Sequence, residues 1–327
     1  MFPKCLKPKS QNPLGTISNS ASKKVLITGS NGLVGQKVLA QLLQRQEYEV
    51  VATGLDGPRL PSSWADGYKW ASLDIRDAEE VNAIMQLERP DFVIHTAAMT
   101  QVDQCEQNPE SCWEVNVKAV SHIVQACKVY HCHLIHLSTD FVFDGTDGPY
   151  TEDATPNPVN FYGKSKLAAE QIIRESAISY TIVRTVLVYG LGHDLSRSNL
   201  ILWVKASLEK GKQIKVVNDQ WRTPTLAEDL AWGCIAIMDK CVTGIINISG
   251  ESWLTPFEMA LQVVDFFGLD GTHIEEVSAA TFIEPAKRPP KTGLVIERAK
   301  TLLNYTPKSF MDGIGILAKQ LKLANCN

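Results

Sequence analysis

The chain has 327 residues, of which 44% are apolar and 21% charged, and its formal net charge is −4. This length and composition suit one large globular domain or two closely joined ones. Lys and Arg are spread along the chain without a basic block, so the sequence predicts neither a nucleic-acid partner nor membrane-surface binding. Apolar runs fall short of the roughly 20 residues that cross a bilayer, so no transmembrane segment is predicted.

Residues 1–22 differ from the rest of the chain in composition. They contain three lysines, three prolines and several serines, but no acidic residue. The segment has no apolar stretch of the kind found in secretory signals. We interpret it as a disordered leader, and a transit peptide is the alternative that its composition leaves open.

From Lys23 onward, short apolar runs alternate with helical patterns. The predicted strands cover residues 24–28, 50–52, 91–95, 133–137 and 180–184, and the predicted helices cover residues 33–43, 115–129 and 160–173. Apolar strands that alternate with helices predict an α/β fold, a Rossmann-type doubly wound parallel sheet covered on both faces. After Gly190 predicted strands and helices no longer alternate regularly, although residues 245–248 again resemble a strand.

We therefore predict two interleaved units after the leader. The first is a Rossmann domain over residues 23–190, with a returning segment near residues 226–250. The second is a smaller C-terminal α/β lobe over residues 191–327. It contains a helix, a loop, several short helices and a proline-rich stretch.

The eight cysteines are irregularly spaced and include no C-x-x-C pair, which favours a reducing, cytoplasmic compartment. The segment His131-Cys132-His133 with His136 contains metal-ligand residue types. We predict no metal there, because His133 and His136 would point to opposite faces of a strand and no further ligand completes a tetrahedral set.

A glycine-rich segment connects the first predicted strand to the first predicted helix. It follows Thr28 and has the pattern G-x-x-G-x-x-G. Glycines permit a tight turn and close approach to a pyrophosphate, whose charge the helix N-terminus favours. We therefore predict dinucleotide binding by the first domain. The loop residues assigned to it are Gly29, Asn31, Gly32, Leu33, Val34 and Gly35.

The second predicted strand indicates which dinucleotide is bound. A carboxylate at its tip would favour the free ribose of NAD, but the strand ends without one, and Arg59 follows. We predict NADP, with NAD as the alternative because Asp56 could fold back. Asp74 and Ile75 lie between the predicted strands 50–52 and 91–95 and suit an adenine-edge contact, although Asp74 alternatively serves as a solvated helix N-cap.

Tyr162 and Lys166 are spaced i, i+4 on a predicted helix, so they share one face. A free tyrosine has a pKa of about 10, and a nearby ammonium lowers it. The same lysine can bond a ribose hydroxyl. Thr139 ends a predicted strand, and strand ends of this kind face the ligand crevice, where a hydroxyl can hold a substrate carbonyl oxygen. This set predicts proton transfer beside the cofactor.

The order of these motifs resembles the short-chain dehydrogenase/reductase superfamily in its extended form, from about Val25 to the end of the chain. Thr96-Ala97-Ala98 resembles that family's cofactor-facing turn, and Asn116 its structural asparagine. The resemblance implies cofactor contacts for Ala97, Ala98, Thr100, Tyr162 and Lys166.

Longer segments resemble one branch, the dTDP-4-dehydrorhamnose reductases. They are Ser-Thr-Asp-Phe-Val-Phe-Asp-Gly over residues 138–145, Tyr-Gly-Lys-Ser-Lys over 162–166, Arg222-x-Pro-Thr and Arg288-Pro. The resemblance implies NAD(P)H-dependent reduction of the 4-keto group of a dTDP-linked 6-deoxy sugar, the last step toward dTDP-L-rhamnose. The implied catalytic residues are Thr139, Tyr162 and Lys166. The implied substrate-binding residues are Thr139, Asp140, Phe141, Asn199, Arg222 and Arg288.

The same residues bear on three alternative functions: a dehydratase, an epimerase and a regulatory subunit. Dehydratases of the superfamily have Asp-Glu after the strand-end threonine, whereas here Asp140 is followed by Phe141. Epimerases usually have a serine-rich turn there. A catalytically idle, NADP-binding regulatory subunit, like that of methionine adenosyltransferase, is the alternative of another class, and the intact Tyr162 and Lys166 weigh against it.

The sequence leaves the exact sugar and the choice between monomer and homodimer open. Leu187 occupies a position where this branch commonly has an aromatic residue. Trp203 and Trp221 are candidates for a replacement aromatic contact, and ordinary packing is the alternative for both.

Overall fold

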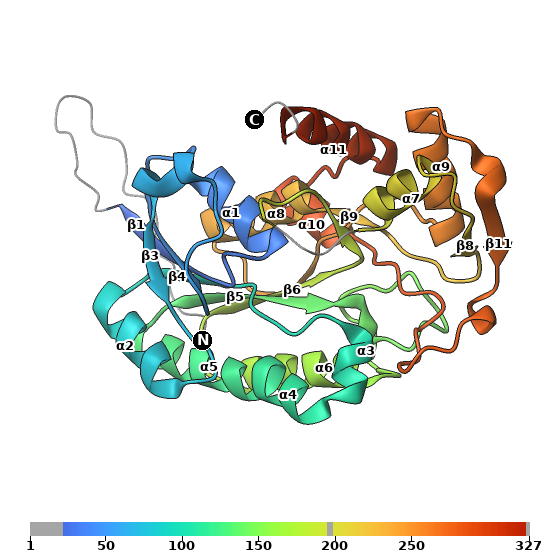
Figure 1. Cartoon of the computed structure of the whole chain (residues 1–327). Coiled ribbons are helices and arrows are strands. Elements are labelled where there is room, and N and C mark those ends of the chain that lie inside the picture. Colours follow the sequence, from blue (N-terminus) through green and yellow to red (C-terminus); the bar gives the residue numbers. More distant parts are fainter. Residues whose placement is uncertain (1–21, 195–198, 325–327) are drawn as a thin grey trace.

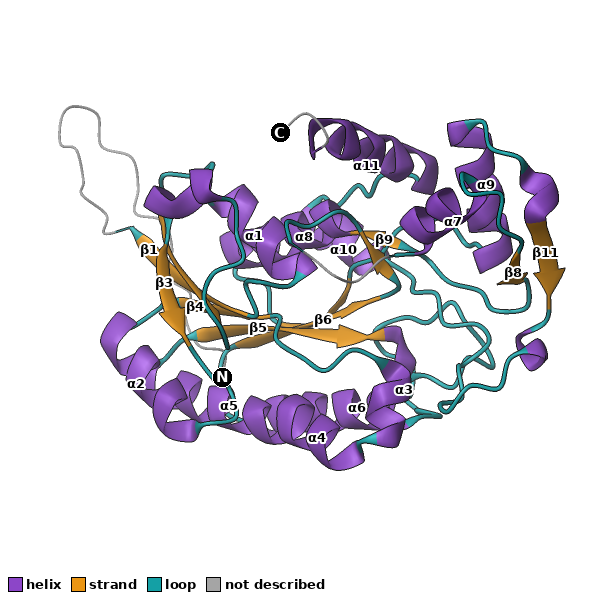
Figure 2. Ribbon diagram, viewed as in Figure 1, coloured by secondary structure: helices purple, strands orange, loops and turns teal. Residues whose placement is uncertain are grey.

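The computed structural model describes residues 22–194 and 199–324, so nearly all of the predicted leader lies outside the described residues. Seven parallel strands form the central sheet in the order β10-β6-β5-β4-β1-β2-β3 (Figures 1 and 2). The strands of this sheet are β1 (Lys23–Thr28), β2 (Tyr48–Gly54), β3 (Lys69–Ser72), β4 (Phe92–His95), β5 (His133–Thr139), β6 (Tyr180–Thr185) and β10 (Gly244–Asn247). The predicted α/β, doubly wound class is confirmed.

Helices cover both faces of this sheet (Figure 1). The helices of the first domain are α1 (Leu33–Leu42), α2 (Ala78–Glu88), α3 (Val102–Gln107), α4 (Pro109–Trp113), α5 (Ala119–Tyr130) and α6 (Phe161–Glu175). A π-helical turn, Glu114–Lys118, joins α4 to α5. Two separate buried apolar clusters, one on each face, hold the helices to the strands. Burial on both faces explains why the strands are nearly continuous apolar runs.

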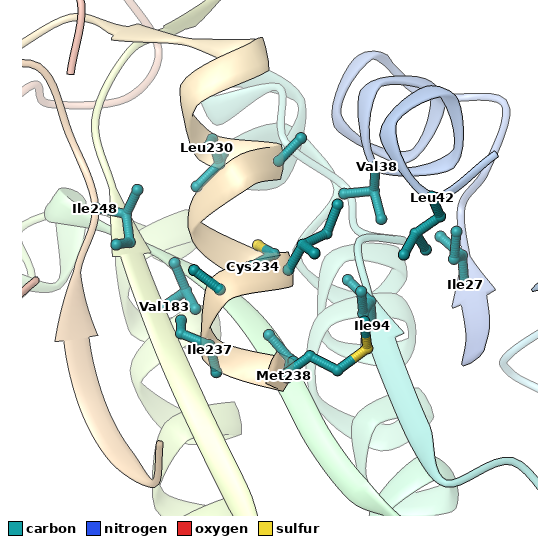
Figure 3. Packing of buried hydrophobic residues seen from close by; sticks show 14 of the residues in the cluster. Ile27, Val38, Leu42, Ile94, Val183, Leu230, Cys234, Ile237, Met238 and Ile248 are labelled. Carbon is teal, nitrogen blue, oxygen red and sulfur yellow. The ribbon is translucent and has the colours of Figure 1, made fainter. Parts of the chain in front are cut away.

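The chain returns to this sheet after leaving it. Helix α8 (Ala227–Lys240) packs against α1, and β10 pairs with β6 at the edge of the sheet. Four residues of α8 belong to the same buried cluster as Ile94 and Val183 of the sheet (Figure 3). They are Leu230, Cys234, Ile237 and Met238. Helix α10 (Glu297–Leu303) packs on α8 and β10. Segments far beyond residue 190 therefore complete the core of the first domain.

The smaller lobe, which lies to the right in Figure 2, has its own buried apolar cluster. Its elements are α7 (Leu200–Leu208), β8 (Ile214–Val217), α9 (Pro256–Phe267), β11 (Ile274–Val277) and α11 (Phe310–Ala324). Strands β8 and β11 pair in parallel. The sequence interpretation placed only a helix and a loop over residues 191–225 and missed β8, whose four residues are too few for a clear period. A two-stranded pair, β7 (Val188–Tyr189) and β9 (Thr225–Leu226), connects the lobes.

The strand order creates a topological switch point between β1 and β4. The connections β1 to β2 to β3 run one way from β1, whereas β4 to β5 to β6 run the other way. Such a switch point opens a ligand site at the carboxyl ends of the strands. Thr28, His95 and Thr139 are the last residues of β1, β4 and β5. Among the described residues, no helix has the length and apolar character to cross a membrane.

A buried ion pair anchors α6 to the sheet, and its loss tests the fold. Glu170 accepts hydrogen bonds from Arg184 Nη2 at 2.7 Å and Nε at 3.0 Å, and from Ser138 Oγ at 2.6 Å. Both charged side chains are at most 1% exposed. We expect Glu170→Ala to lower the free energy of unfolding in urea by about 3–5 kcal/mol, because the buried Arg184 loses its paired countercharge.

Glu209→Ala is the matched control, because Glu209 pairs with Lys205 on the surface of α7. We expect it to cost at most about 0.5 kcal/mol. Equal losses in the two variants would contradict the anchoring role of Glu170.

Candidate active site

Thr139 and Tyr162 meet where β5 ends and α6 begins. Asn160 caps α6 by accepting a hydrogen bond from the Gly163 N–H. A Cβ atom at Gly163 would lie 2.1 Å from the Phe141 carbonyl oxygen, so only glycine lets the helix start so close to the residues that follow β5. The Thr139 hydroxyl lies beside Tyr162 and lowers its pKa, and the Phe141 ring meets the Tyr162 ring edge-on at 6.1 Å.

The environment of Tyr162 keeps its phenol protonated. Burial raises its pKa above the ordinary value and the charge of Asp140 raises it further, whereas the hydrogen bond with Thr139 lowers it. The expectation that Lys166 would lower this pKa is not what the structure shows, because burial outweighs the other effects. A protonated tyrosine is the form required of a general acid.

Lys166 lies on the next turn of α6, where it contacts a histidine that the sequence analysis had not connected to it. Its Nζ lies 3.1 Å from His136 Nε2, and burial lowers the pKa of Lys166 to about 8. Burial and the lysine charge hold the pKa of His136 well below its usual range. His136 is therefore a neutral imidazole that accepts a hydrogen bond from the charged lysine.

His136 connects Lys166 to the strand below the glycine loop. Its ring stacks on His95 at 5.2 Å, and His95 Nδ1 lies 2.6 Å from Thr28 Oγ1. His95 and His136 are register partners on β4 and β5. The sequence signal that points to this pair is a histidine near the carboxyl end of each of two apolar strands. From the sequence, only His136 is weighed, as a metal ligand that is rejected, and His95 is not singled out.

The glycine loop fits a pyrophosphate. A Cβ atom at Gly35 would lie 2.5 Å from the Gly29 carbonyl oxygen and 2.7 Å from Ser30 Cα, so the loop wraps directly onto the start of α1. Gly32 is the N-cap of α1, and no side chain caps this helix end. Its first N–H groups and the helix dipole are therefore suited to an anion. Leu33 and Val34 are half-buried in the same turn.

Asn31 positions the loop that was predicted to select NADP. Its Nδ2 donates to the Gly57 carbonyl at 3.0 Å, and its Oδ1 accepts from the Arg59 N–H at 2.8 Å. Arg59 itself is exposed beyond the end of β2. The Asn31 side chain is therefore used to hold the loop from Gly57 to Arg59 beside the phosphate cradle.

The predicted adenine-edge residues lie after β3. Asp74 pairs with Arg76 at 2.6 Å, and this contact lowers the pKa of Asp74. The interpretation of Asp74 as a helix N-cap is wrong, because Asp77 caps α2 instead. Ile75 is buried next to it, at 8% exposure.

The turn after β4 contains the other predicted cofactor residues. Ala97 and Ala98 are half-buried, and Thr100 is exposed. Asn116 fixes this turn, because its side chain bonds the Met99 N–H at 2.8 Å and the Met99 carbonyl at 2.9 Å.

The structure brings together only part of the predicted substrate set. Asp140 and Phe141 directly follow Thr139, and the Arg222 guanidinium lies over the Phe141 ring at 5.5 Å. Arg288, by contrast, makes a double contact of 2.7 Å with Asp103. Asn199 caps α7 and donates to the Gly190 carbonyl. Arg288 and Asn199 thus have structural partners, and their substrate contacts stay predictions.

Aromatic residues line a hollow near these segments. Trp221 stacks on Trp253 at 5.9 Å, and the pair borders a hollow of about 490 Å³ with Lys291. Trp203 is exposed on α7. Leu187 is 44% exposed and has a left-handed backbone, with φ of +36°, just beyond β6. A leucine in this conformation is strained, which is more common at functional sites than elsewhere.

The glycine cradle, the strand-end threonine and the Tyr-x-x-x-Lys helix define an extended short-chain dehydrogenase/reductase. Within that superfamily the chain belongs to the family described as the RmlD substrate binding domain, whose model matches residues 23–323. The predicted resemblance to dTDP-4-dehydrorhamnose reductases is thereby confirmed.

Several known proteins are similar to this chain. The chain is 32% identical to the probable low-salt glycan biosynthesis reductase Agl14 of Haloferax volcanii, covering 89% of this chain and 96% of that protein. It is 29% identical to methionine adenosyltransferase 2 subunit beta of Rattus norvegicus, covering 87% and 84%. The solved dTDP-4-dehydrorhamnose reductase of Bacillus anthracis, in complex with NADP, matches with a TM-score of 0.77 at 26% identity over 91% of this chain and 99% of that one.

Gly35→Ala tests the phosphate cradle. We expect NADPH to bind at least tenfold more weakly, about 1.4 kcal/mol, because the added Cβ displaces the loop from the start of α1. Isothermal titration calorimetry measures the change. Gly315→Ala is the control, since its Cβ would meet only the Phe266 ring, at 3.6 Å. Unchanged affinity in Gly35→Ala would contradict the assignment.

Proposed function

We propose that this chain is an NADPH-dependent reductase of the 4-keto group of a dTDP-linked 6-deoxy sugar. The single observation that carries the proposal is the contact between Tyr162 and Thr139 at the carboxyl end of β5. The glycine cradle follows β1, so it lies at the same end of the parallel sheet. The similarity to the NADP complex from Bacillus anthracis supports the cofactor and the sugar class.

In this proposal NADPH, when bound, supplies a hydride to the keto carbon. Tyr162 gives its proton to the oxygen on which negative charge develops, and its raised pKa keeps that proton in place at neutral pH until then. Thr139 orients the same oxygen. Lys166, fixed by His136, holds the ribose of the cofactor. The proposed partner is a nucleotide sugar, the proposed compartment is the cytoplasm, and the proposed assembly is a monomer or a homodimer.

A regulatory role is the second candidate, because the rat relative is a subunit of methionine adenosyltransferase 2. A nucleotide-sugar epimerase is a further alternative within the superfamily. The protonated Tyr162 beside Thr139 favours the reductase, because an idle subunit does not need a general acid in hydrogen-bond contact with a second hydroxyl.

Tyr162→Phe tests the reductase. We expect kcat for NADPH oxidation to fall by about 10²–10⁴-fold across a panel of dTDP-4-keto-6-deoxy sugars, because the proton donor is lost. NADPH affinity should change by less than about threefold. A wild-type protein that binds NADPH, reduces none of these sugars and co-purifies with a second enzyme would instead support the regulatory role.

Arg59→Ala tests the choice of cofactor. We expect NADPH to bind at least tenfold more weakly, about 1.4 kcal/mol, while NADH affinity stays the same. The reason is that Asn31 holds the Arg59 backbone beside the glycine loop, and we propose that the exposed Arg59 side chain meets the 2′-phosphate. Arg89→Ala is the matched control, since Arg89 lies at the far end of α2 over the Tyr130 ring. Equal losses of affinity for NADPH and NADH would show that Arg59 does not recognise the 2′-phosphate.

A further inference from the structure

Asp140 is a buried carboxylate at the end of the proposed proton donor's hydrogen-bond chain. It follows β5 directly and is 3% exposed. Its Oδ1 accepts from the Thr139 hydroxyl at 3.0 Å, and its Oδ2 accepts from the Thr292 hydroxyl. Both oxygens are therefore occupied by neighbouring hydroxyl groups, an arrangement that differs from the direct substrate contact expected of Asp140.

The number of hydroxyl protons on Thr139 and Tyr162 determines which group donates in each hydrogen bond. An ionised carboxylate can only accept, so the single hydroxyl proton of Thr139 lies in its bond to Asp140. While Tyr162 is protonated, its own proton must then occupy the contact with Thr139; Thr139 can donate in return only to the phenolate, and this is how it lowers the pKa of Tyr162. Both protons point toward Asp140, and Thr139 has none left to donate to a substrate oxygen.

Protonation of Asp140 reverses this chain. The carboxylic acid becomes a donor to Thr139, which frees the threonine proton for the reacting oxygen or for Tyr162. We propose that Asp140 is a positioning residue and proton store, which in its acid form aims the Thr139 hydroxyl at the substrate and re-protonates Tyr162 through Thr139. This inference rests on the proposed reductase function.

The proton movements balance over one turnover. Tyr162 loses its proton to the alkoxide and becomes a phenolate. The Thr139 O–H bond then breaks toward the phenolate oxygen while the Asp140 O–H bond breaks toward Thr139 Oγ1. Tyr162 and Thr139 end as they began, and Asp140 ends as a carboxylate that takes its next proton from water. No electrons move in these steps, since the reduction itself uses the hydride.

The surroundings of Asp140 raise its pKa toward neutral pH. Burial raises its pKa to about 6, while the charge of Arg222 and the hydrogen bonds from Thr292 and Thr139 oppose that rise. The charged or titratable groups that face it are Arg222, from the segment before β9, and Tyr162, from α6. The acid form accumulates as the pH falls through about 6, so reduction should become faster in that range.

The test compares the pH dependence of kcat between pH 5 and 8 in the full-length protein, with NADPH and a dTDP-4-keto-6-deoxy sugar. We expect the wild type to show a rise centred near pH 6. Asp140→Asn keeps the hydrogen bond to Thr139 but stores no proton. We expect it to lose this rise and to be about tenfold slower than the wild type at pH 6, with little change in KM.

Two further variants separate the relay from simple structural support. Thr292→Val removes one hydrogen bond that lowers the pKa of Asp140, so the rise should move to higher pH. Thr139→Ser should keep the rise, because the hydroxyl is retained. The proposal is overturned if Asp140→Asn keeps the wild-type midpoint or if it raises KM alone, as expected of a residue that only binds substrate.

A substrate-free measurement distinguishes failure of this inference from failure of the proposed function. Infrared difference spectra between the wild type and Asp140→Asn should gain the carbonyl band of a carboxylic acid as the pH falls from 7.5 to 5. A wild type with this band that reduces no keto sugar refutes the substrate assignment alone. A wild type that reduces the sugar without this band refutes the role of Asp140.

Discussion

The buried ion pair between Glu170 and Arg184 determines where the reactive side chains lie. Glu170 is one helical turn beyond Lys166 on α6, while its partners Arg184 and Ser138 lie on the neighbouring strands β6 and β5. A charge pair with no solvent access tolerates few alternative geometries, because leaving either charge unpaired in the interior is costly. This pair therefore fixes the height and rotation of α6, and with them the positions of Tyr162 and Lys166 over the end of β5.

The same burial that makes this anchor rigid also sets the chemistry of the site. Tyr162 stays protonated, Lys166 is easier to deprotonate than usual, and His95 and His136 remain neutral, the pKa of His95 falling to about 3. In each case burial disfavours the charged form. The result is a protonated phenol beside the Thr139 hydroxyl and a lysine that donates to a neutral imidazole, which suits the transfer of a proton in step with a hydride.

The segment from Glu284 to Thr292 closes this site from the side of the smaller lobe. Arg222 donates to the carbonyls of Pro289 and Pro290, and Thr292 bonds Asp140. Arg288 ties the same segment to Asp103 after β4. Sequence similarity assigns Arg222 and Arg288 to the substrate, but in this structure both contact or belong to the segment from Glu284 to Thr292. Proteins similar to this chain include a probable reductase and a subunit of methionine adenosyltransferase 2, so activity has to be tested on the proposed proton-transfer residues themselves.

The sequence by itself determined the sheet class, the glycine cradle and the identity of Thr139, Tyr162 and Lys166, because each depends on local spacing: apolar runs, glycines between a strand and a helix, and an i, i+4 pair. Only the tertiary structure decided the partners of these residues. The contact of Lys166 with His136 joins positions thirty residues apart, and that of Asp140 with Thr292 joins positions 152 apart. Such contacts form when strands and loops pack, and packing also excludes the water that would otherwise keep their pKa values ordinary. The sequence therefore names the proposed proton donor, while the fold decides which groups lie beside it.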